Sequence, residues 1–306
     1  MATRKLPNVF LQRNKLIKKT PGEMVLNIIV LVLFSIYTAF FLYLVGYIVF
    51  SSFLTENSYR DIFFDKKYVL ELTFAKFIDA LKIKVSTTTG RDIMLPEMFF
   101  NSLWFCLFSV VGGVLMSAFT GYVISKYEFK GRALIYSVVI FCMTIPIIGT
   151  TSSLLKLVNS PFLPIGNTPL YVLITSLGGF GFNFMVMHAF FKNVSWSYVE
   201  AVLIDGGGHF TAFFKVMLPQ ATPSLITLSI LSFIGSWNDY TTPMMFLPDY
   251  PTVASGAYAL SQSAKRTADF PLIFAGLLLS FIPVLILFII FSDRIMKNFS
   301  IGGLKG

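Results

Sequence analysis

The chain has 306 residues, of which 55% are hydrophobic and only 13% are charged. A soluble domain carries about a quarter of its residues as charged side chains, so this composition excludes a soluble globule and indicates an integral membrane protein. The net charge of +9 fits the basic cytoplasmic flanks of a membrane protein better than a nucleic-acid-binding surface, because no separate basic domain is present.

Intervals without charged residues predict where the chain crosses the membrane. A helix rises about 1.5 Å per residue, so about 20 apolar residues cross a hydrocarbon core about 30 Å thick. The first interval is too long for the apolar region of a cleaved signal peptide, so we expect it to remain as a helix. We therefore expect an all-α integral membrane protein with six transmembrane helices, at Met24–Thr55, Met98–Ser125, Ala133–Leu155, Leu170–Phe191, Val216–Asn238 and Phe270–Ser292.

Basic residues predict the orientation of these helices. They gather in the tail of residues 1–23, in the loop after the second span and in the tail of residues 293–306. Because Lys and Arg collect on cytoplasmic flanks, both termini are expected in the cytoplasm. Two segments are then external: residues 56–97, expected to be partly helical around Val69–Lys84, and the loop Asp249–Asp269.

The membrane part after the first helix at 24–55 covers residues 98–292. On its second span, Gly113, Ser117 and Gly121 recur every four residues, a spacing that favours close packing of helices.

A cytoplasmic loop at residues 193–219 interrupts the apolar pattern before the fifth span. Ser195 or Ser197 can cap a short helix with Glu200 in its first turn, and Gly206–Gly208 then permit a sharp turn. A second helix should follow as far as Met217, with prolines at 219 and 223 kinking the entry into the fifth span. This arrangement predicts a short helix across the cytoplasmic mouth, rigidly joined to a membrane helix.

The same loop carries a resemblance to a known family. Glu200, Ala201, Gly206, Val216, Leu218 and Pro219 stand in the register of the EAA loop of binding-protein-dependent ABC import permeases, and Asp205 fits the Asp–Gly pair of its sugar branch. Val202 and Gly207 depart from the alanines that are usual at their positions. The stretches Asn101–Arg132, Ser236–Leu247 ("SWNDYTTPMMFL") and Gly302–Gly306 ("GGLKG") also resemble the maltose-type carbohydrate family, as its second permease.

This resemblance implies a type I ABC importer permease in the plasma membrane of a prokaryote, crossing the lipid several times. It implies four kinds of partner: a second related permease, two ABC ATPase subunits, an extracellular solute-binding protein and the carbohydrate substrate, a sugar or oligosaccharide. ATP and Mg²⁺ would be bound by the ATPase, since the sequence has no Walker A motif and no cofactor is expected on this chain. The residues implied in ATPase coupling are Glu200, Ala201, Asp205, Gly206, Gly207, Leu218 and Pro219.

Polar residues among the later spans mark a candidate substrate path. In this interpretation Trp237 stacks on the sugar, while Asn238 and Asp239 bind its hydroxyl groups. Asp239 fits solvation at the outer membrane boundary equally well, and Asn183 fits a bond between helices as well as a path. The path candidates are Asn183, Trp237, Asn238, Asp239 and Tyr240.

The sequence also bears on four alternatives: an enzyme, a metal site, a permease for another solute and an ion-coupled carrier. Glu200 and Asp205 could serve acid–base chemistry, but no second cluster of catalytic residue types accompanies them, so no enzyme is expected. His188 and His209 are isolated, and Cys106 and Cys142 have no metal spacing, so no metal site is expected. An ABC permease for a peptide, amino acid or osmolyte remains an alternative. A stand-alone ion-coupled carrier is less favoured, because it needs ionisable groups in several spans.

Overall fold

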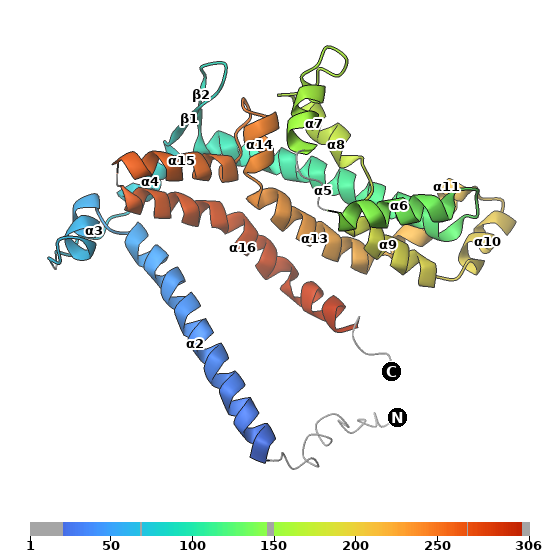
Figure 1. Cartoon of the computed structure of the whole chain (residues 1–306), viewed down its shortest axis with the longest axis horizontal. Helices are drawn as coiled ribbons and strands as arrows, with labels where there is room; N and C mark the ends of the chain where they lie inside the picture. Colours follow the sequence, from blue (N-terminus) through green and yellow to red (C-terminus); the bar gives the residue numbers. More distant parts are fainter. Residues whose placement is uncertain (1–20, 68, 146–149, 268, 302–306) are drawn as a thin grey trace, which may run out of the picture. The chain divides into compact units, whose positions relative to one another are not determined.

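The computed structural model of the chain describes residues 21–67, 69–145, 150–267 and 269–301, most of them helical (Figure 1). Contacts divide the chain into two units, Met1–Ser51 and Ser52–Gly306. Most of the basic tail predicted at 1–23, and residues 302–306 of the C-terminal tail with its GGLKG motif, lie outside the described residues. The elements are α2 (Pro21–Ser52), α3 (Glu56–Phe63), α4 (Ala75–Leu81), β1 (Lys84–Ser86), β2 (Asp92–Met94), α5 (Leu95–Lys126), α6 (Arg132–Thr144), α7 (Thr150–Val158), α8 (Pro169–Ser176), α9 (Phe182–Asn193), α10 (Ser197–Ile204), α11 (His209–Ala212), the π-helical segment η1 (Phe213–Met217), α12 (Leu218–Gln220), α13 (Thr222–Asn238), α14 (Thr241–Phe246), α15 (Val253–Thr267) and α16 (Phe270–Ile301).

Among the described residues, three helices are long and apolar enough to cross a membrane: α2, α5 and the Phe270–Ser292 part of α16. They coincide with the first, second and sixth predicted spans. Most of the large apolar side chains of α2 are exposed, which suits a helix whose solvent is lipid. A fourth crossing is possible if the helices on either side of residue 221, which are bent by 76°, count as one span.

The expectation of one continuous helix per interval is wrong for the third and fourth intervals. In the third, α6 ends at Thr144 and α7 begins at Thr150. Pro146 follows the end of α6, and proline disfavours helical backbone before it. In the fourth, α8 ends at Ser176 and α9 begins at Phe182, because Gly179 and Gly181 take positive φ angles of 67° and 141°.

The fifth interval is divided as well, at the prolines that predicted a kink. α13 begins at Thr222 and carries Pro223 in its first turn, whereas Pro219 lies in α12. Proline is tolerated in the first turn of a helix because its missing N–H has no intrahelical partner there. The predicted kinked entry is therefore confirmed.

The segment 56–97 differs from the prediction of an all-α protein. Its helices are α3 and the short α4, so the expected helix around Val69–Lys84 is confined to Ala75–Leu81. Strands β1 and β2 form an antiparallel hairpin in which Val85 pairs with Ile93, and Gly90 turns with φ 79°. An alternating pattern of three residues is too short to be recognised as a strand from sequence.

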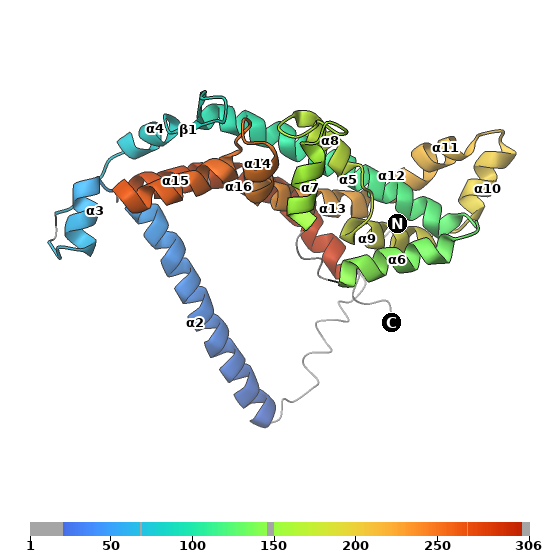
Figure 2. The same ribbon diagram turned by 45° about the horizontal axis from the view of Figure 1, so that its top comes forward.

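Two clusters of buried side chains form the core of residues 52–306. One joins the N-terminal half of α5 to α8, α13 and α14 through Phe105, Tyr171, Trp237 and Phe246. The other joins the C-terminal half of α5 to α9, α10, η1 and α13. α5 thus runs through both clusters, and α13 lies beside it in both views (Figures 1 and 2).

The small residues of α5 pack closely against α9, as their spacing predicted. Ser117 is buried, and a Cβ added to Gly121 would lie 2.9 Å from the backbone nitrogen of His188 and 3.0 Å from Cβ of Met187. A Cβ added to Gly113 would lie 3.9 Å from its nearest neighbouring atom, which is an ordinary contact distance. The close approach of the helices therefore does not require glycine at position 113. The close contact is therefore concentrated toward the end of α5 that bears Lys126.

Candidate functional site: the α10 lever and the central pocket

α10 is a short helix whose first turn carries Glu200, as expected. The N-cap position is occupied by Trp196 and has no side-chain cap bond; Ser195 Oγ instead accepts from the backbone N–H of Ser197 at 3.2 Å. Neither predicted serine therefore caps the helix. α10 buries Val199 completely and leaves Glu200, Ala201 and Asp205 exposed.

The end of α10 is a glycine-based turn that reverses the chain. Gly206 takes φ 81°, its N–H donates to the carbonyl of Leu203 at 3.1 Å, and the N–H of Gly207 donates to the carbonyl of Val202 at 2.8 Å. This pair of bonds, with a left-handed residue just after the helix, is the Schellman arrangement. Of the three glycines predicted to form a turn, only Gly206 needs positive φ; Gly208 has φ −91°.

The two departures from the EAA pattern touch each other. A Cβ added to Gly207 would lie 2.6 Å from Cγ1 of Val202, closer than real Cβ contacts allow. Val202 is larger than the alanine usual at its position, and Gly207 is smaller than the alanine usual at its own. The larger side chain therefore fills the space that the smaller one leaves.

This compensation predicts a rescue. Gly207→Ala should destabilise the turn by about 1–3 kcal/mol through overpacking, and adding Val202→Ala should restore most of the loss. Transport and thermal stability of the assembled transporter would be measured for both single variants and the double variant. Additive losses in the double variant would contradict the compensation.

Tyr127, which follows α5, contacts the residue that precedes α10 and the first residue of α11. Its hydroxyl lies 2.9 Å from Nδ1 of His209, and its ring packs edge-on against Trp196 at 5.5 Å. Lys126 donates from Nζ to the carbonyl of Val194. Sequence reasoning assigned no role to Tyr127; its contacts join segments 82 residues apart, which no local pattern reveals.

The rest of the loop is divided between a buried and an exposed face. Val199 and Met217 are fully buried, in the same cluster as Tyr122 of α5 and Phe191 of α9. The opposite face exposes large apolar side chains, with Ile204 84% accessible. We call the segment 197–220 the lever; its other large exposed apolar side chains are Tyr198, Leu203, Phe210 and Phe214. Leu218 is partly buried against the core, and Pro219 is exposed.

Asp239 lies at a pocket of about 260 Å³ between α5, α8 and α13–α14, which we call the central pocket. Oδ1 of Asp239 accepts from the backbone N–H groups of Thr241 and Thr242, each at 3.0 Å, so the carboxylate is held at the pocket edge. Hydroxyl and aromatic side chains form the rest of the wall. The lining residues are Phe105, Ser109, Tyr171, Val172, Thr175, Ser176, Ser236, Asp239 and Thr242.

The other path candidates lie elsewhere. Trp237 is only 4% exposed, its Nε1 donates to the carbonyl of Ser280 at 3.0 Å, and its ring stacks on Phe233. In this structure the Trp237 ring is occupied by contacts in the core. Asn183 donates from Nδ2 to Ser232 Oγ at 3.0 Å. This bond joins α9 to α13, as expected if Asn183 bonds a neighbouring helix instead of lining a substrate path.

Asn238 and Tyr240 are also not among the lining residues of the central pocket. Asn238 donates from Nδ2 to the carbonyl of Ile234 one turn earlier, and the Tyr240 ring stacks on Tyr258 at 4.7 Å. Sequence reasoning missed the hydroxyl side chains of the central pocket, because Ser and Thr in membrane helices more often bond to their own backbone.

Within the described parts of the chain, no group of three or more His, Cys, Asp or Glu side chains could hold a metal ion. His209 bonds to Tyr127, whereas His188 packs on the Tyr136 ring at 4.6 Å.

The chain was compared with protein families, with curated proteins and with solved structures. Residues 109–300 match the family described as binding-protein-dependent transport system inner membrane component. The chain is 30% identical to a diacetylchitobiose uptake system permease of Streptomyces coelicolor, over 69% of this chain and 70% of that protein. It is 30% identical to an arabinooligosaccharides transport system permease of Halalkalibacterium halodurans, over 68% and 74%.

A solved structure shares the fold. A bacterial ABC transporter involved in the import of the acidic polysaccharide alginate contains a chain that superimposes with a TM-score of 0.71 at 20% identity, over 90% of this chain and 99% of that one. The family match covers more than half of the sequence and includes the lever and every lining residue of the central pocket except Phe105. The chain therefore belongs to the family of inner membrane components of binding-protein-dependent transport systems, and it is a multi-pass membrane protein of ABC permease fold.

Proposed function

We propose that the chain is a permease subunit of an ATP-driven ABC importer that moves a sugar or oligosaccharide delivered by an extracellular binding protein. One observation carries the mechanism: α5 is a continuous helix that contributes Phe105 and Ser109 to the central pocket and Tyr122 to the core under the lever. A displacement of the lever is thus transmitted along one rigid element to the pocket. Curated relatives named for oligosaccharide uptake support a carbohydrate substrate.

The partners follow from what the lever exposes. Apolar side chains beside Glu200 and Asp205 suit a groove on an ATPase subunit, one for each permease of a pair. Closure of two such ATPases around ATP and Mg²⁺ would carry the lever with it. Each ligand shifts the inward- and outward-facing populations only by its differential affinity for the two states.

The proposed topology has six crossings with cytoplasmic termini. α6 has 13 residues and is therefore only about 20 Å long, so it crosses only together with α7; α8 and α9 form another broken crossing. The end of α5 that bears Lys126 lies at the lever, because Tyr122 of that end packs in one cluster with Val199 and Met217, and Arg132 begins α6. The positive-inside rule therefore places the lever in the cytoplasm and the β1–β2 hairpin outside.

An uptake panel tests the substrate class. Proteoliposomes holding the complete transporter and its binding protein would be offered diacetylchitobiose, arabino-oligosaccharides, trehalose, and a peptide, an amino acid and an osmolyte. We expect ATP-dependent uptake of a carbohydrate and no uptake when the ATPase is omitted. Uptake of only a non-sugar solute would favour the same architecture with another cargo, and uptake without the ATPase would indicate a stand-alone carrier.

A further inference from the structure

A second pocket, which we call the outer pocket, lies at the opposite end of α5 from the lever. Its volume is about 480 Å³, within the range of about 300–1,000 Å³ found for ligand pockets. α5, the turn before β2 and the loop after α14 contribute its walls. The lining residues are Arg91, Glu97, Phe100, Asn101, Trp104, Phe108, Pro169, Asp249 and Tyr250.

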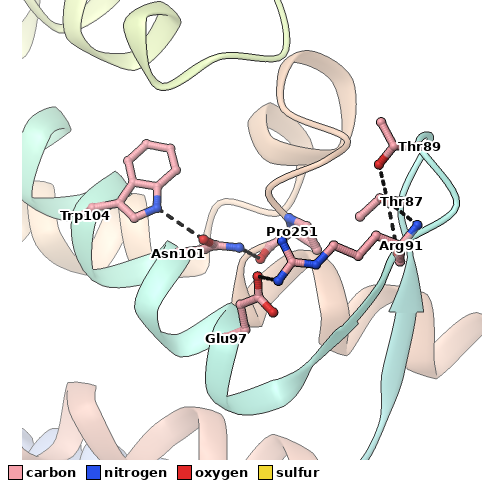
Figure 3. A network of polar contacts seen from close by, with 7 residues as sticks. All are labelled: Thr87, Thr89, Arg91, Glu97, Asn101, Trp104 and Pro251. Carbon is pink, nitrogen blue, oxygen red and sulfur yellow. Dashed lines mark hydrogen bonds and ion pairs between the residues drawn. The ribbon is translucent and has the colours of Figure 1, made fainter.

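The polar side of the outer pocket is held in place by a network of bonds. Nε1 of Trp104 donates to Oδ1 of Asn101 at 3.2 Å, and Nδ2 of Asn101 donates to the carbonyl of Pro251 at 3.0 Å (Figure 3). Arg91 pairs with Glu97 at 2.9 Å, and both side chains remain partly exposed. The Asn101 amide is therefore used within this network and holds the Trp104 ring before any ligand arrives, which lowers the entropic cost of binding. Arg91 and Glu97 keep exposed polar edges that a ligand can reach.

Asp249 completes this side from a different loop. Oδ1 accepts from the Thr88 hydroxyl at 2.6 Å, and Oδ2 accepts from Nδ2 of Asn167 at 2.7 Å. The Thr88 and Asn167 bonds hold the pKa of the Asp249 carboxyl below its ordinary value, so it stays ionised. A charged acceptor therefore joins the exposed guanidinium of Arg91 in the lining of the outer pocket.

The apolar side of the outer pocket is aromatic. The rings of Trp104 and Tyr250 meet at 88° with centroids 6.0 Å apart, and Phe108 lies 6.0 Å from Trp104. The face of an aromatic ring is electronegative and attracts the slightly positive C–H groups of a pyranose, while planar carboxylate and guanidinium groups match vicinal hydroxyls. Together the two walls have the chemistry of a carbohydrate subsite.

The position of the outer pocket along α5 agrees with a site where sugar enters the membrane part from the outside. α5 ends at Lys126 on the lever side, and about 20 residues are needed to cross the hydrocarbon core, so the outer boundary falls near Trp104. Arg91, Glu97 and Asp249 then lie in water, and the aromatic rings lie at the interface. We propose that the outer pocket is a carbohydrate subsite that receives sugar at the external face; this inference rests on the proposed function and on its orientation.

Calorimetry tests this subsite on the complete purified transporter without its binding protein. The probe is the imported carbohydrate of the uptake panel. We expect Trp104→Ala to weaken sugar binding about fivefold to tenfold, and Trp104→Phe, which keeps an aromatic face, to stay near the wild-type value. Phe162→Ala is the matched control, because Phe162 is 89% exposed and lies outside the lining. Arg91→Gln should weaken sugar binding about threefold. Because the Arg91 side chain is exposed, this variant replaces Trp104→Ala as the test if Trp104→Ala does not assemble.

The outcomes separate the subsite from the transport function. Unchanged affinity in both Trp104→Ala and Arg91→Gln, with wild-type import intact, would overturn the subsite alone. A response of the Trp104 variants to lipid composition but not to sugar would also overturn it, since Trp and Tyr commonly anchor helices at the interface. If the wild-type transporter imports no carbohydrate from the panel, both proposals fail.

Discussion

Gly206→Pro should reduce coupled transport about tenfold or more while the chain still inserts in the membrane. Gly206 has φ 81° and donates its N–H to Leu203, whereas proline requires φ near −65° and has no N–H. The substitution therefore removes both the conformation and one bond of the Schellman turn, at a local cost of about 3 kcal/mol. α10 would lose its orientation toward α11, although the membrane helices would be untouched.

The measurement is uptake together with substrate-stimulated ATP hydrolysis by the assembled transporter. Both should fall, and they should fall further when Glu200→Lys is added, because a cation in the first turn of α10 opposes the helix dipole. Gly208→Ala is the matched control, since Gly208 has φ −91° and open space around its added Cβ. Unchanged transport in the Gly206→Pro variant would refute the coupling role of the lever.

Gly121→Val should destabilise the folded subunit by about 1–3 kcal/mol or more through overpacking. Even a single Cβ at this position would lie 2.9 Å from a backbone nitrogen of α9, and backbone cannot move aside as a flexible side chain can. α5 and α9 would have to separate, which would loosen the cluster that supports the lever. Close approach through small residues is a main source of stability between helices in lipid.

Thermal unfolding of the purified transporter, followed by the loss of its monodisperse elution, measures this effect. Gly113→Ala, on the same face of α5, has its nearest neighbour at 3.9 Å and should melt like the wild type. Equal melting temperatures for Gly121→Val and Gly113→Ala would show that the contact between α5 and α9 is not tight.

The lever illustrates how far local sequence reaches. Glu200 in a first helical turn, a glycine turn at Gly206 and a proline kink at Pro219 are all local features, because capping, positive φ and the missing proline N–H act within a few residues. The reciprocal sizes of Val202 and Gly207 are visible in the sequence as two departures from a pattern. Their contact is seen only in the folded chain, where the Schellman bond between Gly207 and Val202 holds the two positions together.

The sequence by itself determined the membrane class, the long helices α2, α5 and α16, and the position of the lever, since these depend on hydrophobic run length and local backbone preferences. Only the tertiary structure decided that Trp237 is buried, that Asp239 faces a pocket, and that Tyr127 holds His209. Each of these depends on helices distant in the chain packing side by side. Burial and pocket lining are properties of the neighbours that surround a residue, and one chain's local pattern does not encode which neighbours those are.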